Sequence, residues 1–213
     1  MTENIAFALL CFTSFFSLMN PLGVMPVFIT MTANLDAKEQ RLTARKAMFA
    51  AFLTLVAFAF SGQLLFNFFG ISVNGFRIVG GVIFFQMGAD MLQARLGKVK
   101  VPKHEVEQYV ADISITPLAI PMICGPGCIS NAIVLMEDAN TLDMQLILIG
   151  VISLVCLLTY IILFSSTRIS NVLGETGNNV LMRLMGLILM VIAVEFFLSG
   201  ARPILTEWYQ SVH

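Results

Sequence analysis

The sequence has few charged residues. Asp, Glu, Lys and Arg make up only 12% of its 213 residues, whereas soluble domains contain roughly 25%. Hydrophobic residues make up 58% of the chain, which is more than the roughly 45–50% of soluble domains. The net charge is −1, and the few Lys and Arg residues form no basic patch of the kind that binds nucleic acid. This composition excludes a water-soluble globule and predicts a protein that crosses a membrane several times.

Side chains that carry catalysis or bind metals are also scarce. The two histidines, His104 and His213, lie in a charged loop and at the terminus, and no Ser-His-Asp or HExxH arrangement is present. Gly125 and Gly127 form a bare G-x-G without the rest of a phosphate-binding motif. Four cysteines in apolar segments are expected to be small, buried packing residues: Cys11, Cys124, Cys128 and Cys156. We therefore expect no enzyme activity, catalytic residue, cofactor, metal site or disulfide.

Long apolar segments cover most of the chain. Each can cross about 30 Å of hydrocarbon as a helix. Strands of a membrane β-barrel would alternate polar and apolar residues, whereas these runs are continuous. The predicted spans are 5–31, 46–69, 72–93, 113–136, 144–166 and 180–200. The sequence therefore predicts an all-α membrane protein with six transmembrane helices in a single transmembrane domain, residues 1–213.

Positive residues are concentrated in alternate connections between the predicted spans. On the opposite side only Arg77 and Arg202 are positive. Because cytoplasmic loops carry an excess of Lys and Arg, the rich side is predicted to be cytoplasmic. Both termini are therefore predicted to face outward. The positive residues of the cytoplasmic side are Lys38, Arg41, Arg45, Lys46, Arg95, Lys98, Lys100, Lys103, Arg168 and Arg183.

Two stretches of the first half resemble two stretches of the second half. Asn20-Pro21-Leu22-Gly23 resembles Thr116-Pro117-Leu118-Ala119, and Phe76-Arg77-Ile78-Val79-Gly80 resembles Met182-Arg183-Leu184-Met185-Gly186. Each half has three spans, an odd number, so the second half enters the membrane from the opposite side. We therefore predict two inverted three-helix repeats with a broken first helix in each half. Repeat one is about 5–93, the cytoplasmic loop about 94–112, and repeat two about 113–200.

Proline and glycine interrupt the first span of each repeat. Proline lacks an amide donor and clashes with the preceding helical turn, so neither span can continue as a regular helix. Broken helices in matched repeats indicate a secondary transporter with a site near the membrane midplane. The half-helix after each break offers unpaired N–H groups and a positive dipole end, which suit a substrate carboxylate. A structural kink is the alternative for the prolines, and hydrogen bonding between helices is the alternative for the polar side chains.

The two breaks are predicted to face each other and to form the substrate site. Ser17 and Asn20, three residues apart, are expected on one helical face. The predicted substrate-binding residues are Ser17, Asn20, Pro21, Gly23, Thr116, Pro117, Pro121, Gly125, Pro126, Gly127, Ser130 and Asn131. Asp90 and Glu195 are candidates for a proton relay, because ionisable residues within a span are often functional. Placement of both carboxylates at the membrane interface is the alternative.

Several motifs, in this order, resemble the MarC family of bacterial inner-membrane proteins. They are Asn20-Pro21-Leu22-Gly23, Phe69-Gly70-Ile71-Ser72, Phe76-Arg77-Ile78-Val79-Gly80-Gly81, Pro117-Leu118-Ala119-Ile120-Pro121, Gly125-Pro126-Gly127 and Arg183-Leu184-Met185-Gly186. The resemblance covers nearly the whole length. It implies a six-span protein of the bacterial inner (cytoplasmic) membrane, which would put the outward-facing termini in the periplasm. The chain is similar to members of the family that are classed as transporters of small neutral amino acids such as glycine and alanine.

These observations favour a secondary transporter of small neutral amino acids or similar zwitterions that works by alternating access. A proton or sodium gradient would drive it, because no nucleotide-binding motif is present. Its expected partners are the lipid bilayer, a small-molecule substrate and the coupling ion, and no nucleic acid. Two alternatives stay open: a non-transporting membrane component of a partner complex or stress response, and a drug exporter.

Overall fold

The computed structural model describes residues 2–93 and 106–212, and every regular element within these ranges is a helix. This confirms the predicted all-α class. The predicted cytoplasmic residues Arg95, Lys98, Lys100 and Lys103 lie outside the described residues, as do His104 and His213. The elements are α1 (Thr2–Met19), α2 (Pro21–Met31), α3 (Ala37–Phe69), α4 (Val73–Leu92), α5 (Val106–Ile113), η2 (Ser114–Ile123), α6 (Pro126–Asp138) and α7 (Leu142–Val212).

Five helical stretches of the described chain are long and apolar enough to cross a membrane. A bent pair, Gln108–Ile123 and Pro126–Asp138, meets at 61° and makes a sixth if it is one span. Some helices extend beyond the predicted spans. Helix α3 begins at Ala37 rather than at 46, because Asp36 accepts hydrogen bonds from the amides of Lys38 and Glu39 while the Glu39 side chain binds the amide of Asp36. Helix α5 begins at Val106, inside the predicted loop 94–112.

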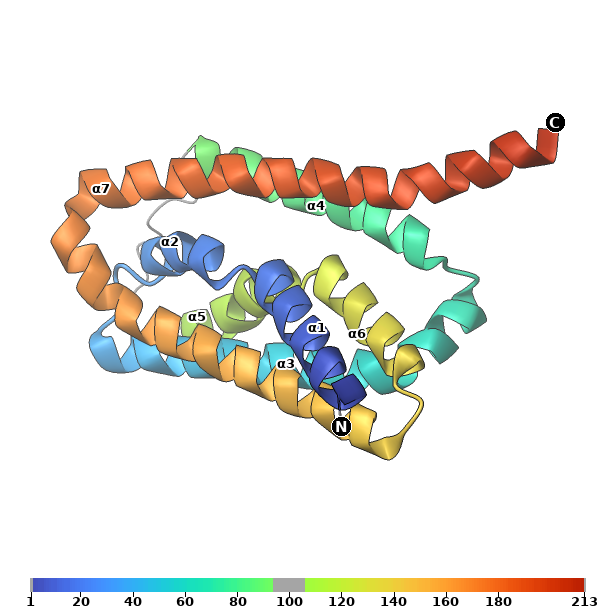
Figure 1. Cartoon of the computed structure of the whole chain (residues 1–213). Coiled ribbons are helices and arrows are strands. Elements are labelled where there is room, and N and C mark those ends of the chain that lie inside the picture. Colours follow the sequence, from blue (N-terminus) through green and yellow to red (C-terminus); the bar gives the residue numbers. More distant parts are fainter. Residues whose placement is uncertain (1, 94–105, 213) are drawn as a thin grey trace.

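The long element α7 consists of two arms that turn back on each other. The arms contain the candidate spans Leu142–Ser166 and Thr176–Gln210, which we call the first and second arms. Gly174 lies between them with φ 65° and ψ −175°, a backbone conformation that favours glycine. Figure 1 shows the arms diverging from this turn. The arms correspond to the predicted fifth and sixth spans.

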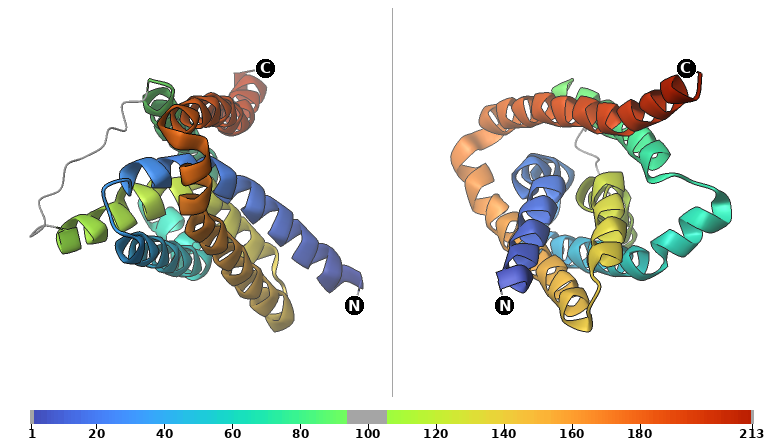
Figure 2. Two further views of the ribbon diagram at one scale, coloured as in Figure 1. Left: turned by 90° about the vertical axis from the view of Figure 1, so that its left-hand side faces the viewer. Right: turned by 45° about the vertical axis from the view of Figure 1, so that its right-hand side comes forward.

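The interrupted helices lie between two pairs of long helices. Helix α3 packs against the first arm of α7 on one side, and α4 packs against the second arm on the other (Figure 1). The segments α1, α2, η2 and α6 lie between these pairs, and Figure 2 shows α1 and α6 enclosed by α3, α4 and α7. Fully buried side chains such as Phe15, Phe28, Leu118 and Ile133 come from these inner segments. The first break and the buried part of the second are therefore in the centre of the protein, whereas Thr116 and Ile120 of the second break are exposed.

The positive residues near α3 lie at one end of the helix bundle. The connection between α2 and α3 and the turn at Gly174 are on the left in Figure 1, whereas the α3–α4 and α6–α7 connections are on the right. Arg41, near the start of α3, lies with its guanidinium carbon 4.7 Å from the centre of the Phe164 ring, near the end of the first arm. This arrangement is consistent with the predicted alternation of the connections between the two ends.

Glycines allow α4 and the second arm of α7 to pack closely and antiparallel. A Cβ atom placed on Gly186 would lie 2.8 Å from the carbonyl oxygen of Gly88 and 2.8 Å from the amide nitrogen of Leu92. A Cβ on Gly81 would lie 2.7 Å from the carbonyl oxygen of Ala193. These contacts involve backbone atoms, which cannot rotate away as a side chain can. The two helices are therefore held at a distance that only a residue without a side chain permits.

We predict that Gly186→Ala lowers the thermal stability of the protein in detergent. The added methyl group must push the backbones apart, and overpacking of this kind costs about 1–3 kcal/mol. Gly150→Ala in the first arm is the matched control, because nothing lies within 4 Å of the added Cβ position. This control is expected to be neutral or to stabilise by about 0.5–1 kcal/mol. Equal melting temperatures for the Gly186→Ala variant and the unmodified protein would contradict the role of close packing.

Candidate functional site

The first break is a single residue, Asn20, between α1 and α2. Its backbone is in the left-handed region with φ 43° and ψ 63°, which Asn adopts more readily than most residues. Its side-chain oxygen accepts a hydrogen bond from the amide of Gly23, 3.2 Å away, and so caps α2. Pro21 follows at the first helical position, where the missing amide donor costs nothing. Asn20 therefore ends one half-helix and starts the next.

The second break is longer and lies in η2. Thr116 (φ −128°, ψ 122°) and Ile120 (φ −126°, ψ 121°) are extended, and each precedes a proline in a cis peptide bond, Pro117 and Pro121. An extended backbone before proline is expected, because the proline ring disfavours the helical region for the preceding residue. In sequence, Thr116-Pro117 resembles Asn20-Pro21. In the structure, however, Thr116-Pro117 lies inside this irregular segment and does not start a regular half-helix.

Helix α6 begins in the way that α2 does. Gly125 stands just before the helix and Pro126 occupies its first position, as Asn20 and Pro21 do for α2. Gly125 has no side chain, so no side-chain hydrogen bond caps α6. The local equivalent of the Asn20-Pro21 junction is therefore Gly125-Pro126, at the end of the second break.

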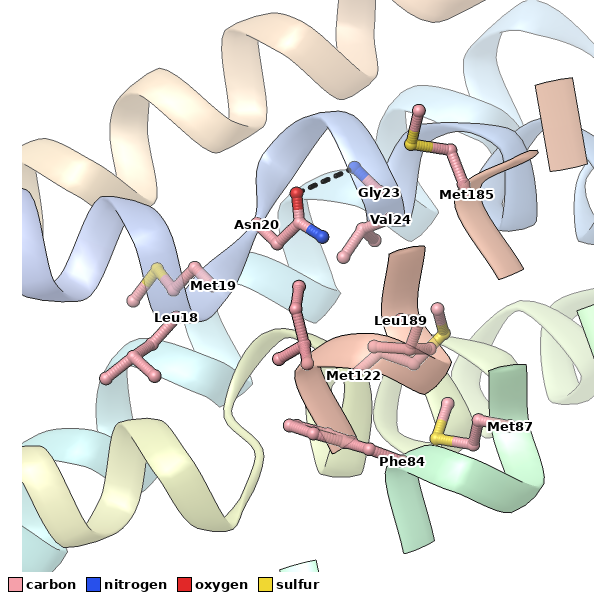
Figure 3. Close-up of a pocket in the computed structure, with 11 residues that line it drawn as sticks. Leu18, Met19, Asn20, Gly23, Val24, Phe84, Met87, Met122, Met185 and Leu189 are labelled. Atoms are coloured by element: carbon pink, nitrogen blue, oxygen red, sulfur yellow. Dashed lines mark hydrogen bonds between the residues drawn. The ribbon is translucent and has the colours of Figure 1, made fainter. Parts of the chain in front are cut away.

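The two breaks meet at a small pocket, which Figure 3 shows in close-up. Asn20, Gly23 and Val24 line it from the first break, and Met122 lines it from the second. The remaining lining residues are Leu18, Met19, Phe84, Met87, Met185, Leu189 and Ile192. The cavity volume is about 20 Å³, which is room for about one water molecule. The structure thus brings the first break and Met122 of the second together, and of the predicted substrate-binding residues only Asn20 and Gly23 line this pocket.

Asn20 is the only polar side chain among the residues that line the pocket. Its oxygen is used to cap α2, whereas its amide nitrogen turns towards the pocket (Figure 3). Within the described part of the chain, no residue accepts a hydrogen bond from this nitrogen. A Cβ atom on Gly23 would lie 2.3 Å from the same nitrogen, so glycine at 23 leaves the space that the amide occupies. Asn20 therefore presents one unused donor to an otherwise apolar pocket.

The glycines of the second break serve close packing. A Cβ on Gly125 would lie 2.3 Å from Cζ of Phe84 and 2.5 Å from the carbonyl oxygen of Pro121. A Cβ on Gly127 would lie 2.7 Å from Cζ of Phe196. Both glycines are among the substrate-binding residues that the sequence predicts. Aromatic rings occupy the space beside them, so neither glycine lines the pocket, and Gly125 borders it only indirectly, through Phe84.

The predicted polar residues have different surroundings. The side-chain nitrogen of Asn131 donates to the hydroxyl oxygen of Ser14, 3.0 Å away, and joins α6 to α1. The Ser130 hydroxyl donates to the carbonyl oxygen of Pro126, 2.8 Å away, within α6. Ser17 and Thr116 are exposed and do not line the pocket. Because α1 ends at Met19, Ser17 and Asn20 do not continue along one helical face.

Methionines are the lining residues that the sequence analysis missed. Met19, Met87, Met122 and Met185 come from α1, α4, η2 and α7, respectively. The chain has 13 methionines, and nothing in the sequence distinguishes these four from the others. Methionine is unbranched, flexible and polarisable, so it fits irregular spaces and rearranges readily. The pocket is therefore lined by side chains that can change conformation.

The two candidate relay carboxylates, Asp90 on α4 and Glu195 on the second arm of α7, lie away from this pocket. Both side chains are exposed, and neither lines the cavity. The four cysteines are all buried and free. Among the described residues, no group of three or more His, Cys, Asp or Glu side chains could hold a metal ion. The pocket's chemistry therefore comes from thioethers, hydrocarbon side chains and one amide.

Comparison with known proteins identifies a family for this fold and pocket. The family model described as "MarC family integral membrane protein" matches residues 5–205. A UPF0056 membrane protein of Pyrococcus horikoshii is 37% identical over 95% of this chain and 98% of its own length. The UPF0056 membrane protein YvbG of Bacillus subtilis is 37% identical, over 92% of this chain and 96% of its own.

Similar proteins occur in both archaea and bacteria. The UPF0056 membrane protein YhcE of Escherichia coli is 33% identical over 91% of both chains. The names of these relatives describe membrane proteins and not enzymes. No solved structure matches the chain.

We predict that Gly125 and Phe84 are energetically coupled. Gly125→Val should destabilise the protein by about 1–3 kcal/mol through overpacking. When it is combined with Phe84→Ala, which removes the ring, the pair should be less destabilising than the sum of the two changes by about 0.5–3 kcal/mol. Thermal unfolding in detergent measures the stability of the two single variants and of the double variant.

Gly150→Val combined with Phe84→Ala provides the control for this cycle. Gly150 has no neighbour within 4 Å of its Cβ position, so these two effects should add to within about 0.3–0.5 kcal/mol. Simple additivity of Gly125→Val and Phe84→Ala would show that the ring does not set the space at the second break.

Proposed function

The chain belongs to the MarC family of integral membrane proteins, and we propose that it is a secondary transporter of small neutral amino acids or similar small zwitterions. It works by alternating access across the bacterial inner membrane. The observation that carries this proposal is the pocket where two interrupted spans meet in the centre of the protein. Broken helices that meet at the membrane midplane are the usual setting of a transporter's substrate site.

The chemistry of the pocket favours a small ligand without net charge. No charged side chain lines it, so a ligand with an unbalanced charge would be buried without a partner. A zwitterion carries balanced charges: the positive dipole end of α2 suits its carboxylate, and the carbonyl groups at the end of α1 suit its ammonium. Because the amide of Gly23 is already bound by the Asn20 side chain, the hydrogen-bond donor offered to the carboxylate is the side-chain nitrogen of Asn20. The apolar remainder accommodates a small side chain.

We propose that the described conformation is the closed one. A cavity of about 20 Å³ holds about one water molecule and is too small for an amino acid. Opening therefore requires the lining side chains to move. The four methionines, which come from four elements, are suited to this change because their rotamers interconvert readily.

We further propose that residues 1–213 form one transmembrane domain of two inverted repeats, about 5–93 and 113–200. Three observations support this organisation. Helices α2 and α6 both begin with proline at the first position, Pro21 and Pro126. Almost the same number of residues separates Pro21 from Pro126 as separates Arg77 from Arg183. Helix α4 and the second arm of α7, the last span of each repeat, pack antiparallel.

The orientation and the energy source belong to the same proposal. The excess of Lys and Arg at one end supports a cytoplasmic position for that end and a periplasmic position for both termini. A proton or sodium gradient is the proposed energy source. If protons drive transport, Asp90 and Glu195 are the candidate relay residues. Because both lie outside the pocket, the relay would act on the opening of the protein and not on the bound substrate.

We predict that Asn20→Gly abolishes most transport while the protein still folds. Glycine adopts the left-handed backbone of residue 20 and replaces an N-cap residue at a cost of only a few tenths of a kcal/mol. It removes the donor that faces the pocket. A hydrogen bond to a charged group contributes about 1.5–3 kcal/mol, so flux of labelled alanine or glycine should fall about tenfold or more. Proteoliposomes with and without imposed proton and sodium gradients give the measurement.

Asn67→Ala provides the comparison for this experiment, because it removes an exposed amide near the end of α3, outside the pocket. Its flux per folded molecule should remain close to that of the unmodified protein. Equal flux in the Asn20→Gly variant would place the substrate elsewhere. Absence of gradient-dependent flux for any neutral amino acid in the unmodified protein would contradict the transport proposal.

A further inference from the structure

The outer surface of α4 and the second arm of α7 carries one polar side chain among apolar ones. Gln86 on α4 is exposed. Its neighbours along the seam between the two helices include the exposed side chains of Val82, Phe85 and Val194. An apolar surface alone would be explained by contact with lipid. The polar side chain requires a different explanation.

Gln86 lies at the depth of the hydrocarbon. Helix α4 runs from Val73 to Leu92, and its 20 residues span about 30 Å, the thickness of the hydrocarbon core. Gln86 is six residues from the inner end of this helix, about 9 Å along its axis. Its position is therefore not at the membrane surface.

Gln86 has no hydrogen-bond partner among the described residues. Lipid chains offer no donor or acceptor, so an amide that faces them loses the hydrogen bonds it makes in water. Polar side chains at this depth normally face other protein segments and bond across helices. We therefore expect protein to cover this surface in the membrane.

A groove lies beside Gln86 on the same surface. It is formed by Gly81, Val82, Phe85 and Gln86 of α4 and by Ala193, Val194, Phe197 and Leu198 of α7, and its volume is about 440 Å³. Glycine and alanine form its floor because α4 and α7 approach closely there. Phe85 stands at its edge and is 44% exposed. The groove is large enough to receive an aromatic ring from a neighbouring molecule.

We propose that this surface, centred on Gln86 and Phe85, binds a second copy of the same chain and forms a two-fold dimer. A two-fold axis along the membrane normal brings each residue opposite its own copy at the same depth. The Gln86 amide is both donor and acceptor, so two copies satisfy each other with a pair of hydrogen bonds. Phe85 of each copy enters the groove of the other. This proposal concerns the outer surface of α4 and α7 and does not depend on transport through the central pocket.

Single-molecule photobleaching of labelled protein in liposomes tests the dimer. The unmodified chain should bleach in two steps at high protein-to-lipid ratio and in one step after dilution with lipid. Gln86→Leu keeps the size and apolar character of the surface and removes both bonds across the axis. Losing two hydrogen bonds between helices should raise the dimer dissociation constant by about tenfold. Gln63→Leu, an exposed glutamine near the outer end of α3, should leave that constant unchanged.

Cross-linking gives a second measurement that does not depend on the behaviour of Gln86→Leu. The four native cysteines are all buried, so the unmodified chain provides the background. Gln86→Cys should form a disulfide-linked dimer in oxidised membranes, whereas Gln63→Cys should not. One-step bleaching of the unmodified chain at every ratio would overturn the proposal. A dimer that forms but is not cross-linked through Gln86→Cys would overturn the assignment of the surface.

Discussion

The hydrocarbon of the membrane offers no hydrogen bonds, and this constraint decides where the chain can interrupt a helix. A break exposes backbone donors and acceptors that must find partners within the protein. The structure meets this requirement by placing both breaks between pairs of long, uninterrupted helices. At the first break the Asn20 side chain binds the amide of Gly23, and at the second the amide of Cys124 binds the carbonyl oxygen of Ala119. Uninterrupted helices face outwards because their backbone bonds are already satisfied.

The sequence alone predicts the helical class, the membrane spans and the positions of the breaks, because each follows from local chemistry. Continuous apolar runs and prolines act within a few residues of where they stand. The contents of the pocket were not predictable in this way. Met122 and Met185 reach the same cavity from segments far apart in the chain, and their meeting depends on how η2 and α7 pack. The start of α3 at Ala37 could have been predicted from the sequence, because Asp36 and Glu39 form a recognisable capping box.

Glycine illustrates why a motif does not determine its own role. Gly125 and Gly127 permit an unusual backbone or a close approach, and sequence offers no means to tell a ligand from a side chain as the approaching group. The structure places Phe84 and Phe196 there. Asn20, in contrast, does contribute its own groups to the pocket. Its positive φ is unfavourable for most residues, and its side chain both caps α2 and faces the pocket. The residue that combines a role in the local backbone with a place in the pocket is therefore in the shorter of the two motifs.

Two regions of the protein differ in how tightly they are packed: the pair formed by α4 and the second arm of α7, and the space between this pair and the interrupted helices. Backbone contacts at Gly81, Gly88 and Gly186 fix α4 to the second arm of α7, and such contacts permit little sliding. Flexible methionines fill the space between this pair and the interrupted helices. Phe84 belongs to both regions, because it is fixed on α4, lines the pocket and contacts Gly125 at the start of α6. Any movement of α6 relative to α4 must therefore displace this ring, and with it the wall of the pocket.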